Sequence, residues 1–254
     1  MAPRTSARGA CFLPSRAMIE AARQETLSVV VPAYNEGKTI TQILDRVAAL
    51  RLGLHIELIV VDDGSKDDTA DVVRAWAQKA HEGLTVRVIS KPNGGKGSAV
   101  RKGIEVSTGD YVIIQDADLE YDPEDYARLL EPMLAGEADV VYGSRVHGPD
   151  KRGQAKFFYG GRLVTAVTNL LYGSHLSDEP TCYKLFRGPL LRSIPLTCTG
   201  FEFCPEVTAK VLRAGKRIAE VPIRYHPRSI EEGKKIRAMD GFWALWELLK
   251  WRLL

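Results

Sequence analysis

From Leu27 to Tyr142, short apolar runs alternate with segments of helical periodicity. The apolar runs are Leu27–Val31, His55–Val61, Leu84–Ile89, Tyr111–Gln115 and Asp139–Tyr142. Runs of this length, ended by proline, glycine or acidic residues, are typical of buried strands. The helical segments cover Gly37–Leu50, Asp67–Ala80 and Gly94–Val106, with a further one after Pro123. This alternation predicts an α/β fold with a Rossmann-like, mostly parallel central sheet and helices on both of its faces.

The pattern is less regular after Tyr142. In chain order we expect a helix over Phe157–Tyr172, a strand near Cys182–Phe186, a helix around Val207, a strand over Arg217–Ile223, a polar basic loop over Arg224–Arg237 and a helix over Met239–Leu254. The last helix carries tryptophans together with Lys250 and Arg252. Such a helix can lie in a membrane interface, or it can pack on the core of its own domain. Both interpretations are open.

The first 25 residues differ in composition from the rest. Arginine, serine, alanine and proline are frequent, and no acidic residue precedes Glu20. We interpret residues 1–25 as a disordered leader; a transit segment, or a true start at Met18, would look similar. The remaining chain divides into one domain over residues 26–238 and the amphipathic helix of residues 239–254.

Composition limits the class of protein. Hydrophobic residues make up 45% of the 254 positions and charged residues 26%, which is ordinary for a soluble globular chain. The net charge of +3 gives no indication of a nucleic-acid partner. The four cysteines show no CxxC spacing, so we expect buried thiols in a reducing compartment, and hence a cytoplasmic protein; peripheral membrane contact through its last helix stays open. The oligomeric state is not encoded in any pattern.

The segment Tyr111–Glu120 carries the most informative chemistry. Its apolar run stops at Asp116-Ala117-Asp118. Ligands bind at the carboxyl ends of strands in open parallel sheets, and residues two apart in an extended segment point the same way. Two converging carboxylates suit Mg²⁺ or Mn²⁺, which leave coordination positions for substrate phosphates. Two solvated acids before the next helix remain an equally good explanation of this motif alone.

Two other predicted strands also end in polar turns. The first is followed by Pro32-Ala33-Tyr34-Asn35-Glu36 and the second by Asp62-Asp63-Gly64-Ser65. An aromatic ring can stack on a base, and a carboxylate can accept a hydrogen bond from a ring N–H or a ribose hydroxyl. Strand ends that converge on one crevice indicate a nucleotide site. For Pro32–Glu36 alone, a proline-initiated turn before a helix is an equally good explanation.

Taken in order, the motifs VVVPAYNE, VVDDGSKDDT, NGGKGSAVRKG and QDADLEYDPED resemble those of family 2 inverting glycosyltransferases of the GT-A fold. The nearest subgroup comprises the dolichol-phosphate mannose synthases and polyprenyl-phosphate glycosyltransferases. The resemblance extends from about Leu27 to Arg252. It implies a metal-dependent hexosyltransferase that moves a sugar from a donor of the GDP-mannose or UDP-glucose type to a polyprenyl or dolichyl phosphate.

The resemblance also implies roles for individual residues. The nucleotide and donor would be bound by Pro32, Tyr34, Glu36, Asp62, Asp63, Asp116 and Ala117. The metal would be held by Asp116, Asp118 and Glu120, the last standing where relatives often carry glutamine. In the second half, donor contacts would come from Lys184 in a D-x-T-S-G-F-R/K-like segment and from the basic-loop residues Arg228 and Lys234. Cys182 replaces the usual small polar residue of that segment.

Catalysis would depend on Asp118, with Arg145 of a Gly-Ser-Arg turn adding positive charge near the donor. A phosphate acceptor is already an anion and needs no general base, whereas a hydroxyl acceptor needs one. Glu202 and Glu206 of GFEFCPE are the candidates for such a base. Two alternatives therefore stay open: a transferase of the same fold with a soluble, glycan or protein hydroxyl acceptor, and a non-catalytic nucleotide-sugar-binding protein.

Overall fold

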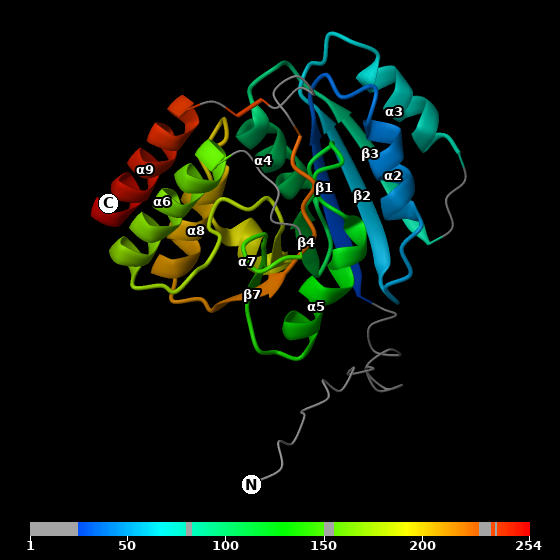
Figure 1. Cartoon of the computed structure of the whole chain (residues 1–254). Coiled ribbons are helices and arrows are strands. Elements are labelled where there is room, and N and C mark those ends of the chain that lie inside the picture. Colours follow the sequence, from blue (N-terminus) through cyan, green and yellow to red (C-terminus); the bar gives the residue numbers. More distant parts are fainter. Residues whose placement is uncertain (1–24, 80–82, 150–154, 229–234, 237) are drawn as a thin grey trace, which may run out of the picture.

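The computed structural model of the chain describes residues 25–79, 83–149, 155–228, 235–236 and 238–254. Seven strands form one sheet in the order β3-β2-β1-β4-β6-β5-β7 (Figure 1). The strands are β1 (Thr26–Ala33), β2 (His55–Asp62), β3 (Leu84–Ser90), β4 (Tyr111–Ile114), β5 (Val140–Ser144), β6 (Lys184–Arg187) and β7 (Ile218–Pro222). The predicted strands are therefore confirmed, with ends that differ by one or two residues at most positions.

Strand directions give the sheet one polar edge. β1 pairs in parallel with β2 and β4, β2 with β3, and β5 with β7. β6 is antiparallel to both of its neighbours, β4 and β5. The predicted mostly parallel sheet is thus confirmed, and β6 is its antiparallel member, which the sequence had not indicated. The carboxyl ends of β1, β2 and β4 lie next to each other at one edge.

The helices follow from the strand order. They are α2 (Ile40–Ala48), α3 (Thr69–Ala77), α4 (Lys96–Val106), α5 (Tyr126–Leu134) after a 3₁₀ turn at Pro123–Asp125, α6 (Ala155–Tyr172), α7 (Gly188–Ser193), α8 (Phe203–Arg213) and α9 (Ala238–Leu253). The steps from β1 to β2 and β3 run in one direction, and the step from β3 to β4 returns past β1. Right-handed crossovers therefore place α4 on the opposite face from α2 and α3, as the prediction of helices on both faces required.

Helix α4 packs unusually close to the central strand. A Cβ atom added at Gly103 would lie 2.3 Å from Cγ1 of Val30. Val30 is fully buried in β1, and Ile104 of the same helix belongs to the same hydrophobic core. The absence of a side chain at Gly103 thus lets α4 lie against the sheet, with its first turn at the polar edge.

Helices α6, α8 and α9 form a separate layer beside the sheet (Figure 1). Val164, Ala209 and Leu248, one from each helix, make a small buried cluster between them. The hydroxyl of Tyr172 in α6 donates to the carbonyl oxygen of Leu248 in α9 at 2.6 Å. The predicted C-terminal helix therefore exists and packs on its own chain. No helix among the described residues is long and apolar enough to cross a membrane.

Some sequence predictions fall outside the described residues. These are the leader, apart from Glu25, together with Cys11 and the basic-loop residue Lys234. The other cysteines, Cys182, Cys198 and Cys204, are free thiols. Helix α7 had not been predicted, because six residues are too few for a helical repeat to be recognised.

Candidate active site

Four carboxylates gather at the carboxyl edge of the sheet, and Arg228 connects three of them. Its Nη2 lies 2.6 Å from Oδ2 of Asp118, its Nη1 3.3 Å from Oε2 of Glu36, and its Nε 3.8 Å from Oε1 of Glu120. Glu36 follows β1 and Asp118 follows β4, whereas Arg228 lies beyond β7. Strand ends that are far apart in the sequence therefore meet at one charged cluster.

The fourth carboxylate, Asp116, has a cation of its own. Lys96 is the first residue of α4, and its Nζ lies 2.5 Å from Oδ1 of Asp116. The same Nζ lies 4.0 Å from Sγ of Cys182 and 5.5 Å from the ring centroid of Phe201. Sequence reasoning missed Lys96 as a site residue, although the NGGKG motif that contains it was recognised. Cys182 likewise belongs to the surroundings of Asp116.

The electrostatics of the two aspartates differ. Burial raises the pKa of Asp118 to about 7, and the charges of Asp116 and Glu120 add to this, although Arg228 opposes them. Burial also opposes ionisation of Asp116, but the adjacent Lys96 ammonium holds the pKa of that carboxyl below its usual value. Asp116 is therefore ionised and paired with Lys96, whereas the acids around Asp118 leave an excess of negative charge that a proton or a cation can balance.

This excess negative charge fits a divalent cation. Oxygen donors from two carboxylates are what Mg²⁺ and Mn²⁺ use when substrate phosphates supply the remaining ligands. Within the described ranges, no three His, Cys, Asp or Glu side chains form a ready-made metal site. Glu120 explains part of this, because its carboxylate accepts from the backbone N–H of Arg228 at 2.7 Å and from the hydroxyl of Tyr225 at 2.8 Å. Glu120 thus anchors the segment after β7, and the ligand role expected for it stays a prediction.

The turn after β1 is tied to the turn after β2. Asn35 adopts a left-handed backbone conformation with φ of 52°. Its N–H donates to Oγ of Ser65 at 3.0 Å, and its Oδ1 accepts from the N–H of Lys66 at 2.8 Å. Tyr34 and Pro32 are half-buried beside this turn. The Pro32–Glu36 segment is therefore a fixed structure that directs Glu36 toward Arg228.

The two aspartates after β2 are buried and hold loops. Oδ1 of Asp62 accepts from the N–H of Ser65 at 3.1 Å. The Asp63 carboxylate accepts from the N–H groups of Gly94 at 3.0 Å and Gly95 at 2.7 Å, and pairs with Lys91. Gly95 has φ of 89°, and a Cβ there would lie 2.4 Å from the carbonyl oxygen of Thr199. Asp63 thereby fixes the glycine-rich loop that presents Lys96.

Arg145 forms a bidentate ion pair with Asp178. Its Nε and Nη2 each lie 2.8 Å from a different carboxylate oxygen, and its backbone N–H donates to Oδ2 at 2.8 Å. Burial opposes both charges, yet the pair raises the pKa of Arg145 and lowers that of Asp178. The guanidinium carbon lies 5.1 Å from the ring centroid of Tyr225. The Gly-Ser-Arg turn and the Asp178 segment are therefore locked together next to the segment that carries Arg228.

Three predicted site residues, Lys184, Glu206 and Glu202, are engaged by groups of the protein itself, and their expected roles stay predictions. Lys184 is fully buried, donates to the carbonyl oxygen of Glu179 at 2.5 Å and lies 3.5 Å from the ring centroid of Tyr142, so it is in the protein interior. Glu206 is fully buried and accepts from Lys210 and from backbone N–H groups. These bonds, against the effect of burial, lower its pKa to about 2. Glu202 accepts from the N–H groups of Thr199 and Gly200.

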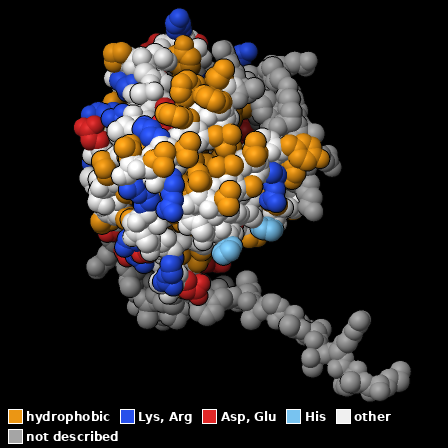
Figure 2. Space-filling model, turned by 90° about the vertical axis from the view of Figure 1, so that its left-hand side faces the viewer, with side chains coloured by type: hydrophobic (Ala, Val, Ile, Leu, Met, Phe, Trp, Pro, Cys, Tyr) orange, Lys and Arg blue, Asp and Glu red, His pale blue; other side chains and the backbone are white. Residues whose placement is uncertain are grey.

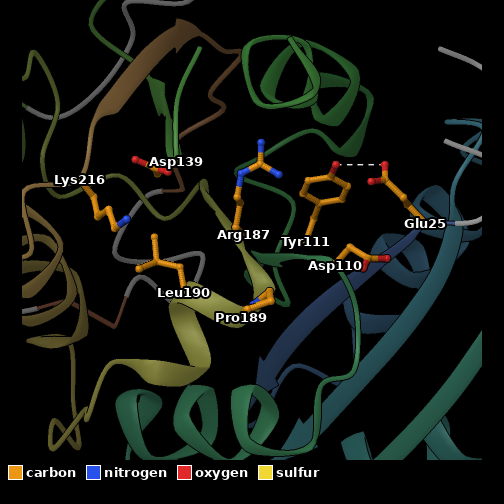
Figure 3. A pocket seen from close by; sticks show the side chains of 8 residues that line it. All are labelled: Glu25, Asp110, Tyr111, Asp139, Arg187, Pro189, Leu190 and Lys216. Atoms are coloured by element: carbon orange, nitrogen blue, oxygen red, sulfur yellow. Dashed lines mark hydrogen bonds between the residues drawn. The ribbon is translucent and has the colours of Figure 1, made fainter. Parts of the chain in front are cut away.

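A separate cavity of about 270 Å³ lies at the other edge of the sheet. Its lining, drawn in Figure 3, includes Tyr111 at the amino end of β4 and Arg187 at the end of the antiparallel β6. The Tyr111 hydroxyl donates to Oε2 of Glu25 at 3.0 Å. This cavity is remote from the carboxyl ends of β1, β2 and β4 and shares no residue with the charged cluster.

Comparisons with known proteins agree with this geometry. The family model described as "Glycosyl transferase family 2" matches residues 28–194. The chain is 33% identical over 211 residues to the low-salt glycan biosynthesis hexosyltransferase of Haloferax volcanii, covering 81% of this chain and 49% of the relative. It is 29% identical over 220 residues to the dodecaprenyl-phosphate galacturonate synthase of Rhizobium johnstonii, covering 85% of this chain and 63% of the relative. The chain thus spans less than two thirds of either relative.

A solved structure shares the fold over nearly the whole chain. Glucosyl-3-phosphoglycerate synthase from Mycobacterium tuberculosis, in complex with Mn²⁺, uridine diphosphate and phosphoglyceric acid, superposes with a TM-score of 0.71 and 26% sequence identity. The superposition covers 95% of this chain and 84% of that one. The predicted GT-A fold is therefore confirmed.

Proposed function

Because the chain belongs to glycosyl transferase family 2, we propose that it transfers a hexose from a nucleotide-sugar donor to a polyprenyl phosphate. The observation that carries this proposal is the pair Asp116 and Asp118 at the end of β4, opposed by Lys96 and Arg228. The dodecaprenyl-phosphate galacturonate synthase and an undecaprenyl-phosphate 4-deoxy-4-formamido-L-arabinose transferase, both among the relatives, bear the matching activity in their names.

The proposed chemistry is a displacement at the anomeric carbon, with a nucleoside diphosphate as leaving group. Asp116 and Asp118 would hold Mg²⁺ or Mn²⁺, which when bound supplies Lewis-acid charge to the diphosphate. Lys96 and Arg228 are placed to add charge-assisted hydrogen bonds to the same group, which carries most of the developing negative charge. The fixed turn at Pro32–Glu36 would bind the base and ribose. Asp62 and Asp63 lie close enough to contribute there, directly or through the loops they hold.

The acceptor is proposed from the surroundings of the two predicted general bases. A hydroxyl acceptor needs a general base with a pKa near the working pH. Of the two predicted candidates, Glu206 is engaged by several donors with its pKa lowered to about 2, and Glu202 also holds backbone N–H groups. A phosphate acceptor needs no base, so a polyprenyl phosphate suits this arrangement better.

A soluble acceptor is the second candidate, and the structural neighbour favours it. Glucosyl-3-phosphoglycerate synthase, whose fold this chain shares, was crystallised with phosphoglyceric acid. A small phosphorylated acceptor would meet the same cationic side chains, Arg145 and Arg228, as a lipid phosphate would. The two candidates therefore differ in the apolar part of the acceptor.

A hydrophobic surface on the layer of α6, α8 and α9 favours the lipid. Figure 2 shows the side of the molecule that carries α6, α8 and α9, with hydrophobic side chains gathered at its centre. The outward residues, which we call the apolar face, are Tyr159, Leu163 and Leu170 of α6 and Met239, Phe242, Trp243, Trp246 and Leu249 of α9. The exposed Arg162 and Arg252 lie on the same helices. Basic residues beside exposed aromatic rings suit an anionic membrane surface, where a polyprenyl phosphate resides.

The test is a transfer assay with radiolabelled GDP-mannose and UDP-glucose in membranes, followed by partition between butanol and water. Label in butanol that depends on Mn²⁺ or Mg²⁺ supports the lipid acceptor. Asp118→Ala should lower the rate about a hundredfold or more, because it removes a carboxylate at the point where charge develops. Label that stays in water with every donor would replace the polyprenyl phosphate by a soluble acceptor, and an undiminished rate in Asp118→Ala would contradict the role of that residue.

A further inference from the structure

We propose that Arg228 occupies the cation position beside Asp118 in the donor-free protein, so that the divalent ion and the donor diphosphate enter the site together. The inference rests on the proposed function for the identity of the ion and donor. It assigns Arg228 a second role beyond donor binding, namely to couple the two binding events.

The contacts of Arg228 carry the argument. Its guanidinium lies within 2.6 Å of Asp118 and 3.3 Å of Glu36, two carboxylates from different strand ends. Its side chain is 18% exposed, so the position is largely closed to bulk solvent. A divalent ion that binds Asp118 would meet this positive charge at close range in a partly buried site. Coulomb repulsion at such a separation is much larger than in water. Arg228 therefore has to leave Asp118 before the ion can bind.

Hydrogen bonds to Glu120 hold the backbone at Arg228, whereas its side chain is held by ion pairs. Its N–H donates to Oε1 of Glu120 at 2.7 Å, and the N–H of His226 donates to the carbonyl oxygen of Glu120 at 2.8 Å. Tyr225 also forms an isolated antiparallel β-bridge with Tyr121. Glu120 thus holds the backbone of Arg228 next to the site. The guanidinium can then exchange one anionic partner, Asp118, for another within reach, the diphosphate.

Charge balance explains why the exchange needs both ligands. Among the described residues of the cluster, four carboxylates (Glu36, Asp116, Asp118 and Glu120) face three cations (Lys96, Arg228 and Lys235). A divalent ion alone would reverse the sign of the cluster, and a diphosphate alone would make it strongly negative. The two together cancel, which leaves the balance of the cluster unchanged. Entry of both ligands is therefore the electrostatically favoured event.

The experiment measures Mn²⁺ binding by the loss of the free-ion EPR signal, with and without saturating UDP or GDP. In the wild-type protein we expect the nucleotide to tighten Mn²⁺ binding, and Mn²⁺ to tighten nucleotide binding by the same factor. Arg228→Gln should bind Mn²⁺ alone about tenfold more tightly than wild type, and should show a smaller coupling factor. Arg228→Lys keeps the positive charge but loses the planar guanidinium. Its affinity for Mn²⁺ should lie between those of wild type and Arg228→Gln. It also serves if the glutamine variant does not fold.

Arg224→Gln is the matched control. Arg224 lies shortly before Arg228 in the chain. It is also paired with acids, Asp122, Glu124 and Asp125, which lie outside the cluster. It should bind Mn²⁺ as wild type does. Equal or weaker Mn²⁺ binding in Arg228→Gln without nucleotide would overturn the inference, while nucleotide-dependent Mn²⁺ binding in wild type would leave the proposed function intact. If wild type binds no Mn²⁺ even with UDP or GDP, the inference and the metal dependence of the proposed function both fail.

Discussion

At the scale of single residues, the contacts of Glu206 indicate a structural role for its carboxylate. It accepts from the N–H of Cys198 at 2.7 Å, from Thr197 at 2.8 Å and from Nζ of Lys210 at 2.6 Å. All these donors belong to the segment that leads into α8 or to α8 itself. The carboxylate therefore stabilises the chain before α8, and its two oxygens are engaged by these donors.

The first prediction follows from this role. Glu206→Gln should lower the free energy of unfolding by about 2–3 kcal/mol at pH 7, because charge-assisted bonds in a buried site are lost. Since the folded-state pKa of Glu206 is lowered to about 2 from an ordinary value of 4.5, its stabilisation is complete above 4.5 and is lost as the pH falls toward 2. Urea unfolding should give a constant difference in the free energy of unfolding between wild type and variant from pH 8 to pH 4.5. Between pH 4.5 and pH 3 this difference should shrink.

The kinetic readout of the same variant distinguishes the two roles. If Glu206 is structural, kcat of the glutamine variant at 20 °C should stay within about twofold of wild type while stability falls. A loss of kcat by several orders of magnitude at unchanged stability would mean that Glu206 is a base after all. Such a result would also favour a hydroxyl acceptor.

Lys96 shows where residue-level prediction stopped. The motif NGGKG could be recognised from the sequence, but the partner of its lysine could not. The 2.5 Å contact with Asp116 exists because α4 crosses back to the sheet and because Asp63 fixes Gly94 and Gly95. Pairings of this kind depend on tertiary packing, which leaves no periodic signal. By contrast, the position of Asp116 and Asp118 at a strand end could be predicted, because the end of the apolar run before them is visible in the sequence.

At the scale of elements, the approach of α4 to β1 decides where Lys96 lies. The second prediction tests this approach. Gly103→Ala should lower the free energy of unfolding by about 1–3 kcal/mol, because the new methyl group would collide with Val30 in the packed core. It should also weaken donor binding, since α4 must shift and carries Lys96 with it. Chemical denaturation and a nucleotide titration measure the two effects.

Gly160 in α6 provides the matched control for this prediction. A Cβ added there meets no atom within 4 Å, and the residue is exposed. Gly160→Ala should therefore leave donor binding unchanged and stabilise the protein by up to about 1 kcal/mol, the usual difference in helix propensity. Equal effects of the two substitutions would show that close packing at Gly103 is not what positions α4.

The direction of β6 and the existence of α7 escaped prediction for the same physical reason. β6 comprises four residues, and its antiparallel direction is set by how the chain returns from α6, not by its own side chains. Helix α7 is six residues long and follows β6 directly. Strands β1 and β2 were easy to predict because their interiors are almost continuously buried, which favours apolar residues at most positions. Short elements are defined by their neighbours, long buried ones by their own sequence.

At the scale of the whole molecule, α9 is apolar on two sides, which reconciles the two interpretations its sequence allowed. Leu248 is fully buried against α6 and α8, and Leu245 and Trp251 pack on the same cluster. Phe242, Trp243 and others on the opposite side are exposed. The inner side accounts for packing on the chain's own core. The outer side continues onto α6 as the apolar face, and exposed apolar patches of soluble proteins often mark binding surfaces.

The last prediction concerns this face. The double variant Trp243→Glu/Trp246→Glu should lose binding to vesicles that contain anionic lipid, because both indole rings, 49% and 50% exposed, would be replaced by charges that a negative surface repels. Co-flotation of the purified protein with such vesicles measures the loss. High salt should weaken wild-type binding without abolishing it, since only the contribution of Arg162 and Arg252 is screened. Leu134→Glu, at a position of α5 that is 36% exposed and lies outside the apolar face, should bind vesicles as wild type does. Unchanged flotation of the double variant would remove the membrane from the proposed function and would direct the search for the acceptor to soluble phosphates.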